Sequence, residues 1–173
     1  MRIMVIGYSG AGKSTLAKTL SNVYEIPVLF MDKLQFEANW VERDPRLRDQ
    51  DLLTFLKTHE NWVIDGNYSA SHFMDRVDLA DHIYILDYPR VTCLKQVIKR
   101  YRTYRKKTRE SIADGCTEKL DWAFIWWVIY KGRSKRRQRH YLWLRKTYPE
   151  KTMSFKNLKQ LNVHLNTLGI HTE

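Results

Sequence analysis

A glycine-rich segment near the N-terminus is the part of the sequence whose residue types and spacing point most directly to chemistry. It fits the pattern G-x-x-x-x-G-K-[ST] and comprises Gly7, Tyr8, Ser9, Gly10, Ala11, Gly12, Lys13 and Ser14, followed by Thr15. Glycines allow turns in which successive backbone N–H groups point at an anion, and the start of a following helix adds positive potential. In this pattern the lysine reaches the β- and γ-phosphates of a nucleotide, and the next hydroxyl ligates Mg²⁺. The segment therefore predicts a triphosphate site.

Three aspartates stand at the ends of predicted strands. Asp32, Asp65 and Asp87 each follow a short apolar run. In a parallel sheet, side chains at the carboxyl ends of the strands line the ligand crevice. We expect Asp65 to face Ser14 as a second metal ligand, and Asp32 to orient or deprotonate the acceptor hydroxyl. Aspartates also favour turns for their local hydrogen bonds, and Asp87 in Asp-Tyr-Pro is interpreted as such a turn.

Two strongly basic segments lie in the second half of the chain. Residues 99–109 hold seven lysines and arginines among eleven residues, and residues 131–139 hold six among nine. Fixed guanidinium groups stabilise a transferring phosphoryl group, and a flap that closes over it excludes water. Most of these charges are expected to be solvated. Nucleic-acid contact is a third interpretation, because Tyr101 and Tyr104 could stack on bases. The tryptophans of residues 122–127 have helical spacing and are expected in the core, which disfavours it.

Alternating strands and helices must position these residues. Short apolar runs predict strands at residues 2–6, 26–30, 62–64, 83–86 and 152–155. Helical apolar spacing is found at residues 13–22, 46–59, 92–104, 120–130, 137–148 and 158–168. This alternation predicts an α/β fold of three layers, with a five-stranded parallel sheet covered on both faces. The strand before the glycine-rich segment and the helix after it distinguish a phosphate-binding loop from an ordinary turn.

Length and composition bound the class of protein. The 173 residues are 43% hydrophobic and 28% charged, enough for the core of a single domain spanning residues 1–173. No apolar run reaches the roughly 18 residues of a membrane span, the N-terminal apolar run is too short for a signal peptide, and two cysteines cannot build a disulfide framework. We therefore expect a cytoplasmic protein with no membrane partner.

Charge is distributed unevenly along the chain. The net charge is +11, with a balance of −3 over residues 1–90 and of +14 over residues 91–173. A half this basic predicts a polyanionic partner. Charge alone leaves nucleotide phosphates, nucleic acid and an anionic membrane surface open.

Several segments together resemble the bacterial DNA topology modulation proteins, a group of adenylate-kinase-like P-loop kinases. The resemblance covers nearly the whole chain and rests on GYSGAGKST, VLFMDKLQFEANWVERD, NWVIDGNYS, ADHIYILDYPR and the basic stretch ending in DGCTEKLDW. It implies a P-loop NTPase fold of the nucleoside-monophosphate-kinase type, with the strand order 2-3-1-4-5 and a short basic lid at residues 105–118. It also implies ATP and Mg²⁺ as cofactors.

The same resemblance implies roles for side chains around the nucleotide. Arg100, and Arg133 or Arg137, resemble arginines that clamp phosphates in such kinases, and Asn157 would lie beside the adenine. Adenylate kinases carry Gly-Phe-Pro-Arg after the strand-end aspartate, where this chain has GNYS at residues 66–69. Because that arginine helps hold the acceptor, the departure argues against AMP as the acceptor here.

These observations predict an ATP-dependent phosphotransferase that transfers the γ-phosphoryl group to a nucleoside, nucleotide or similar small acceptor. The predicted catalytic residues are Lys13, Asp32, Asp65, Arg100, Arg133 and Arg137. The protein is expected to be a monomer or homodimer. Two alternatives stay open: an ATP-binding, DNA-associated regulatory protein without kinase turnover, and a plain ATPase. Acceptor-dependent release of ADP distinguishes the phosphotransferase from both.

Overall fold

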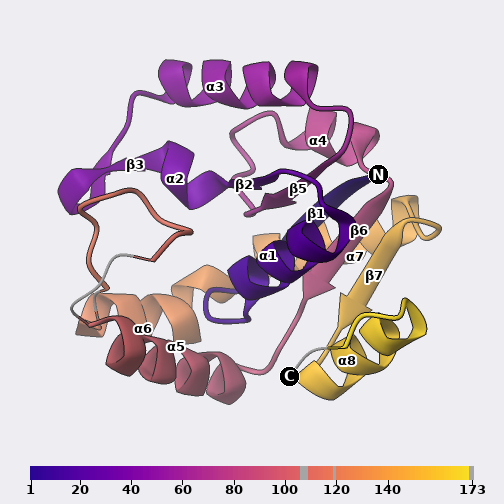
Figure 1. Cartoon of the computed structure of the whole chain (residues 1–173). Coiled ribbons are helices and arrows are strands. Elements are labelled where there is room, and N and C mark those ends of the chain that lie inside the picture. Colours follow the sequence, from indigo (N-terminus) through magenta and orange to yellow (C-terminus); the bar gives the residue numbers. More distant parts are fainter. Residues whose placement is uncertain (106–108, 119, 172–173) are drawn as a thin grey trace.

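The computed structural model describes residues 1–105, 109–118 and 120–171, which are arranged around a central sheet (Figure 1). The strands of this sheet are β1 (Arg2–Gly7), β2 (Val28–Phe30), β5 (Trp62–Asp65), β6 (His82–Leu86) and β7 (Thr152–Phe155). The helices are α1 (Lys13–Tyr24), α2 (Met31–Gln35), α3 (Pro45–Thr58), α4 (Phe73–Leu79), α5 (Arg90–Tyr104), α6 (Trp122–Ile129), α7 (Lys135–Thr147) and α8 (Leu158–Thr167). A small hairpin is formed by β3 (Phe36–Glu37) and β4 (Val41–Glu42).

The central sheet is parallel, in the order β2-β5-β1-β6-β7. Counted along the chain within this sheet, the order is 2-3-1-4-5, which confirms the predicted topology. The register pairs Phe30 and Val5 with Asp65, and Gly7 with Leu86. The carboxyl ends of these strands therefore lie at one edge of the sheet, where α/β proteins bind their ligands.

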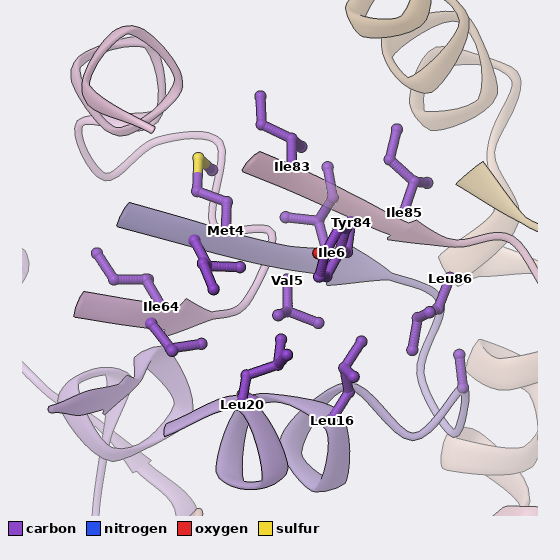
Figure 2. Close-up of a cluster of buried hydrophobic side chains, with 14 of the residues drawn as sticks. Met4, Val5, Ile6, Leu16, Leu20, Ile64, Ile83, Tyr84, Ile85 and Leu86 are labelled. Atoms are coloured by element: carbon purple, nitrogen blue, oxygen red, sulfur yellow. The ribbon is translucent and has the colours of Figure 1, made fainter. Parts of the chain in front are cut away.

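Helices cover both faces of the sheet. Figure 2 shows Leu16 and Leu20 of α1 against one face, whereas Met4, Ile83 and Ile85 point to the other face. Helices α4 and α7 lie on that other face (Figure 1). All five of these side chains are buried. Burying a large aliphatic side chain contributes about 1.5–3 kcal/mol, so the sheet and its two helical layers form a rigid support for the edge residues.

Side-chain caps define where several helices begin. Asp44, Asp121, Ser134 and Asn157 each accept a hydrogen bond from a backbone N–H two or three residues later, at 2.8, 2.7, 3.3 and 2.9 Å. A cap of this kind contributes about 1 kcal/mol. The capped helices α3, α6, α7 and α8 begin within two residues of the predicted starts.

The short elements α2, α4 and the β3–β4 hairpin are not among the predicted ones. Helices α2 and α4 have five and seven residues, too few for a periodic pattern. The hairpin turns through Asn39 and Trp40, whose φ angles of 62° and 64° are left-handed. The Trp40 indole donates to the Thr117 carbonyl at 2.8 Å, and its ring packs on Phe36. Contacts between distant residues, and not local propensity, therefore determine this turn.

The expectation that the tryptophans of α6 lie in the core is wrong. Trp122 is 85% exposed, Trp126 53% and Trp127 41%. The helix packs mainly against α5 and a following 3₁₀ turn (Lys131–Arg133), and Val128 is its buried residue. Helical spacing thus identified the helix but not its buried face. Among the described residues, no helix has both the length and the apolar character needed to cross a membrane.

The predicted lid at residues 105–118 is described only in part, because residues 106–108 lie outside the described residues. Its described part packs on the β3–β4 hairpin. The Gly115 carbonyl accepts from the Asn39 N–H at 3.3 Å, and the Cys116 thiol donates to the Glu37 carbonyl at 3.1 Å. Ile112 and Cys116 are buried. The described part of this segment is therefore held against the β3–β4 hairpin.

Candidate functional site

The loop between β1 and α1 has the backbone shape that the glycine pattern predicts. Gly10 and Gly12 adopt left-handed φ angles of 79° and 87°. A Cβ on Gly10 would lie 2.5 Å from the Cys93 carbonyl oxygen on α5, so only glycine fits there. Helix α1 starts without a side-chain cap. The N–H groups of its first turn are therefore available to an anion.

A cleft of about 1890 Å³ opens above this loop at the strand-end edge. It is lined by residues 9–15 and, among the other predicted site residues, by Asp32, Asp65, Arg100 and Arg137. Gly7, Arg133 and Asn157 are not among the described residues that line it. The structure thus brings most of the predicted site residues together around one cavity.

Ser14 and Asp65 meet at the floor of the cleft. The Ser14 hydroxyl donates to Asp65 Oδ2 at 2.6 Å, although 50 residues separate the two in sequence. Asp65 is buried, and this burial raises the pKa of its carboxyl to about 6, with Asp32 adding to the rise and Lys13 and Ser14 opposing it. The Lys13 ammonium lies nearby and donates to the Tyr8 carbonyl at 3.1 Å.

The donor set at this point fits Mg²⁺. Asp65 Oδ1 is buried and has no hydrogen-bond partner, so this carboxylate has an unsatisfied oxygen beside the Ser14 hydroxyl. Within the described ranges, no group of three or more His, Cys, Asp or Glu side chains could hold a metal. In proteins, Mg²⁺ is commonly bound by one or two carboxylates together with substrate phosphates and water.

Asp32 lines the same cleft and has a partner that the sequence analysis missed. The Tyr68 hydroxyl donates to Asp32 Oδ1 at 2.5 Å. Burial, followed by the charge of Asp32, raises the pKa of Tyr68, so the phenol stays protonated and remains a donor. Both residues line the cleft. The carboxylate predicted to face the acceptor is therefore oriented by a phenol.

Asn67 is a second missed residue, and it connects this loop to the start of the glycine-rich segment. Its Nδ2 donates to the Gly7 carbonyl at 2.8 Å, and its Oδ1 accepts from the Gly7 N–H at 3.3 Å. The Tyr141 hydroxyl on α7 also donates to Oδ1, at 2.9 Å. The Asp-Gly-Asn-Tyr segment could have pointed to Asn67, since it is more particular to the resembled family than the glycine-rich segment is. Its contacts, however, are with residues distant in sequence.

Arg100 and Arg109 share one carboxylate at the cleft. Arg100 Nε donates to Glu118 Oε2 at 3.0 Å, and Arg109 forms an ion pair with the other oxygen of Glu118. The Glu118 side chain is only 2% exposed. Burial, and then the charge of Arg109, lowers the pKa of Arg100 below its usual range. Two guanidinium groups beside one carboxylate leave a net positive charge facing the cavity.

The remaining predicted residues have different surroundings. Arg137 lies over Trp127 and donates to the Gly132 carbonyl at 2.7 Å, at the margin of the cleft. Arg133 is buried, lies 3.8 Å above the Tyr8 ring and donates to the Tyr88 carbonyl at 2.7 Å. Asn157 caps α8. In this structure Arg133 and Asn157 thus make hydrogen bonds within the protein and do not line the cleft.

Comparisons with known proteins identify the fold. No protein-family model and no curated protein matches the chain. A deoxyadenosine kinase from M. mycoides with the products dCMP and dCDP bound has a TM-score of 0.54 and 15% identity, covering 98% of this chain and 99% of that chain. The same kinase with bound dATP has a TM-score of 0.52 and 16% identity, covering 98% of this chain and 100% of that chain.

A protein from Thermus thermophilus, TT1252, has a TM-score of 0.55 and 12% identity, covering 100% of this chain and 98% of that chain. At these identities the similarity concerns the fold. Together with the β1–α1 loop, it shows that the chain has the α/β fold of the P-loop kinases.

Proposed function

We propose that this protein is an ATP-dependent phosphotransferase that moves the γ-phosphoryl group of ATP to a small acceptor. The observation that carries the proposal is the 2.6 Å hydrogen bond from Ser14 to Asp65, beside Lys13 at the start of α1. It pairs the hydroxyl of the phosphate-binding pattern with a strand-end carboxylate, as Mg²⁺-dependent P-loop enzymes do. The fold shared with a deoxyadenosine kinase favours a kinase over other uses of this loop.

The donor side of the site would bind the triphosphate. Backbone N–H groups between Gly7 and Thr15 would surround it, and Lys13 would exchange its bond with the Tyr8 carbonyl for phosphate oxygens. Ser14 and Asp65 would hold Mg²⁺, for which Asp65 Oδ1 offers the free oxygen. When bound, the ion neutralises charge on the phosphate oxygens.

The acceptor side would position the attacking oxygen. In our proposal that oxygen attacks the γ-phosphorus in line, the bond to the β-phosphate oxygen breaks, and ADP leaves. Asp32 would accept the proton if the acceptor is a hydroxyl, while Tyr68 holds the carboxylate in place. Arg100 and Arg137 would stabilise charge on the transferring group. Arg133 would take part only after leaving its contact with the Tyr88 carbonyl.

The acceptor class we propose is a nucleoside, nucleotide or similar small compound. The test is a screen for ADP release with Mg·ATP and a panel of nucleosides, nucleotides and hydroxylated metabolites. Release that depends on one acceptor, with a phosphorylated product detected by mass spectrometry, is the expected result. ADP formation at the same rate without any acceptor would identify an ATPase and contradict the proposal.

A second candidate is an ATP-binding regulatory protein that associates with DNA without kinase turnover. Trp122 and Trp126, in the basic second half of the chain, are exposed, and this favours the second candidate. Exposed aromatic rings together with cations bind single-stranded nucleic acid. DNA affinity of this kind falls steeply with salt. Tight, salt-sensitive DNA binding without acceptor-dependent ADP release would select this candidate.

A further inference from the structure

Arg76, on helix α4, is a buried cation that neither the sequence analysis nor the proposed chemistry uses. Its side chain is wholly buried. Nη1 donates to the Gly66 carbonyl at 3.1 Å, and Nη2 donates to the carbonyls of Asn67 and Tyr68 at 3.1 and 2.9 Å. One guanidinium group therefore binds three successive carbonyls of the loop that follows β5.

The loop needs such a donor because its backbone is irregular. Gly66 has φ of 134° and Tyr68 has φ of 29°, so the segment forms no regular ladder that could satisfy its carbonyls. A buried carbonyl without a partner costs about 1–3 kcal/mol. A guanidinium offers several donors in one rigid plane and can satisfy all three.

Burying a cation costs free energy. This cost indicates that the loop depends on the hydrogen bonds that Arg76 donates. Burial lowers the pKa of Arg76 to about 10, and Asp49 partly offsets the fall. The group therefore stays charged at neutral pH, and its bonds to the carbonyls are charge-assisted, which makes them stronger than neutral ones. An apolar side chain could fill the same space but would remove the donor from the Gly66 and Asn67 carbonyls, and it would leave the Tyr68 carbonyl with only its 3.0 Å bond from the Ser71 N–H.

The residues that Arg76 holds act on both ends of the candidate site. The Asn67 side chain binds the N–H and the carbonyl of Gly7, where the phosphate-binding loop begins. The Tyr68 hydroxyl binds Asp32, which faces the acceptor. The same loop starts immediately after Asp65. Fixing the three carbonyls thus fixes the distance between the donor side and the acceptor side.

We propose that Arg76 is a positioning residue that holds the donor and acceptor ends of the site in register through Asn67 and Tyr68. This inference rests on the proposed function for its kinetic consequence, but its structural consequence can be measured without turnover. Displacement of a reacting group by about 1 Å can lower a rate about 100-fold. Arg76 itself is not among the described residues that line the cleft.

The test compares Arg76→Lys and Arg76→Gln with Lys151→Met. Lys151 is a matched control, because its Nζ donates to a backbone carbonyl of the same helix, that of Val77, at 2.7 Å, and neither residue lines the cleft. We expect Arg76→Lys to lower kcat about 10- to 100-fold and to leave the KM for ATP within about threefold. Added guanidinium should restore part of the rate in Arg76→Gln. Lys151→Met should retain wild-type kinetics.

The second readout is hydrogen exchange of the Gly7 amide, followed by NMR. We expect exchange at Gly7 to be at least about 10-fold faster in Arg76→Lys, with core amides of β6 unchanged, because only the Asn67 contact is loosened. If wild-type protein transfers no phosphoryl group, the proposed function fails, but this exchange experiment still decides the role of Arg76.

Three results would overturn the inference. Unchanged exchange at Gly7 together with unchanged kcat would show that the loop does not depend on Arg76. Faster exchange throughout the sheet, or failure of both variants to fold, would assign Arg76 to overall stability. Equal kinetic loss in Lys151→Met would show that any weakening of α4 has the same effect.

Discussion

The donor side and the acceptor side of the cleft are built in different ways. The donor side comes from one continuous segment, residues 7–15, whose glycines and following helix determine its shape locally. The proposed acceptor side is assembled from α2, the loop after β5 and Arg109, which meet only in the folded chain. The comparison teaches that backbone-based phosphate binding can be recognised from a motif, whereas an acceptor pocket depends on side-chain contacts between distant segments.

The largest expected effect concerns the donor side. Lys13→Ala removes the cation beside the phosphate-binding loop, and we expect turnover to fall by about 1000-fold or more because charge on the transferring group is no longer neutralised. Steady-state ADP release measures it. Lys57→Ala, on the exposed side of α3, is the matched control. If Lys13→Ala retained a rate within a few-fold of wild type, the proposed role of the donor side would be contradicted.

The next prediction separates the two sides directly. Asp32→Asn removes the carboxylate held by Tyr68, and we expect kcat to fall about 100-fold, within the usual range for a lost general base. The affinity for Mg·ATP, measured by calorimetry, should stay within about threefold because Asp32 belongs to the acceptor side. Asp78→Asn is the matched control, since Asp78 accepts from Tyr148 in a comparable pair away from the cleft. Loss of ATP binding in Asp32→Asn would contradict this division.

The buried carboxyl of Asp65 makes the donor side costly in folding free energy near neutral pH. Burial raises the pKa of its carboxyl to about 6 from 3.8, so the folded protein holds this proton more tightly than the unfolded chain. Stability from this group is present at about pH 4 and is lost as pH rises through about 6. In metal-free buffer, Asp65→Asn should therefore be more stable than wild type by about 3 kcal/mol near pH 7.5, with most of the difference gone near pH 4. Urea unfolding across this range measures it; a difference independent of pH would contradict the account.

The smallest expected effect concerns the proposed acceptor side. Tyr68→Phe removes one hydroxyl that donates to Asp32 at 2.5 Å, and we expect kcat to fall about 10-fold because the carboxylate is less well oriented. Tyr148→Phe is the control. An unchanged kcat in Tyr68→Phe would show that the phenol does not act on Asp32.

The elements that the sequence revealed are those whose signals are local. The loop at residues 7–15 and the pairing of Ser14 with the strand end at Asp65 follow from glycine spacing, apolar runs and a parallel sheet, whereas the order of the central strands was implied by the resemblance to adenylate-kinase-like P-loop kinases. Tyr68 and Asn67 escaped notice because their roles depend on Asp32 and Gly7, which are distant in sequence. Trp122 was misplaced because helical spacing does not say which face is buried.

The central claim is that the β1–α1 loop, with Ser14 and Asp65, binds ATP together with Mg²⁺. The most direct measurement is calorimetric titration of a non-hydrolysable ATP analogue into wild-type protein and Asp65→Asn, each with Mg²⁺ and with EDTA. We predict that removal of Mg²⁺ weakens binding to wild type about 10-fold or more and leaves binding to Asp65→Asn unchanged, because that variant has lost the charged ligand. No binding to wild type, or the same response to EDTA in both proteins, would contradict the claim.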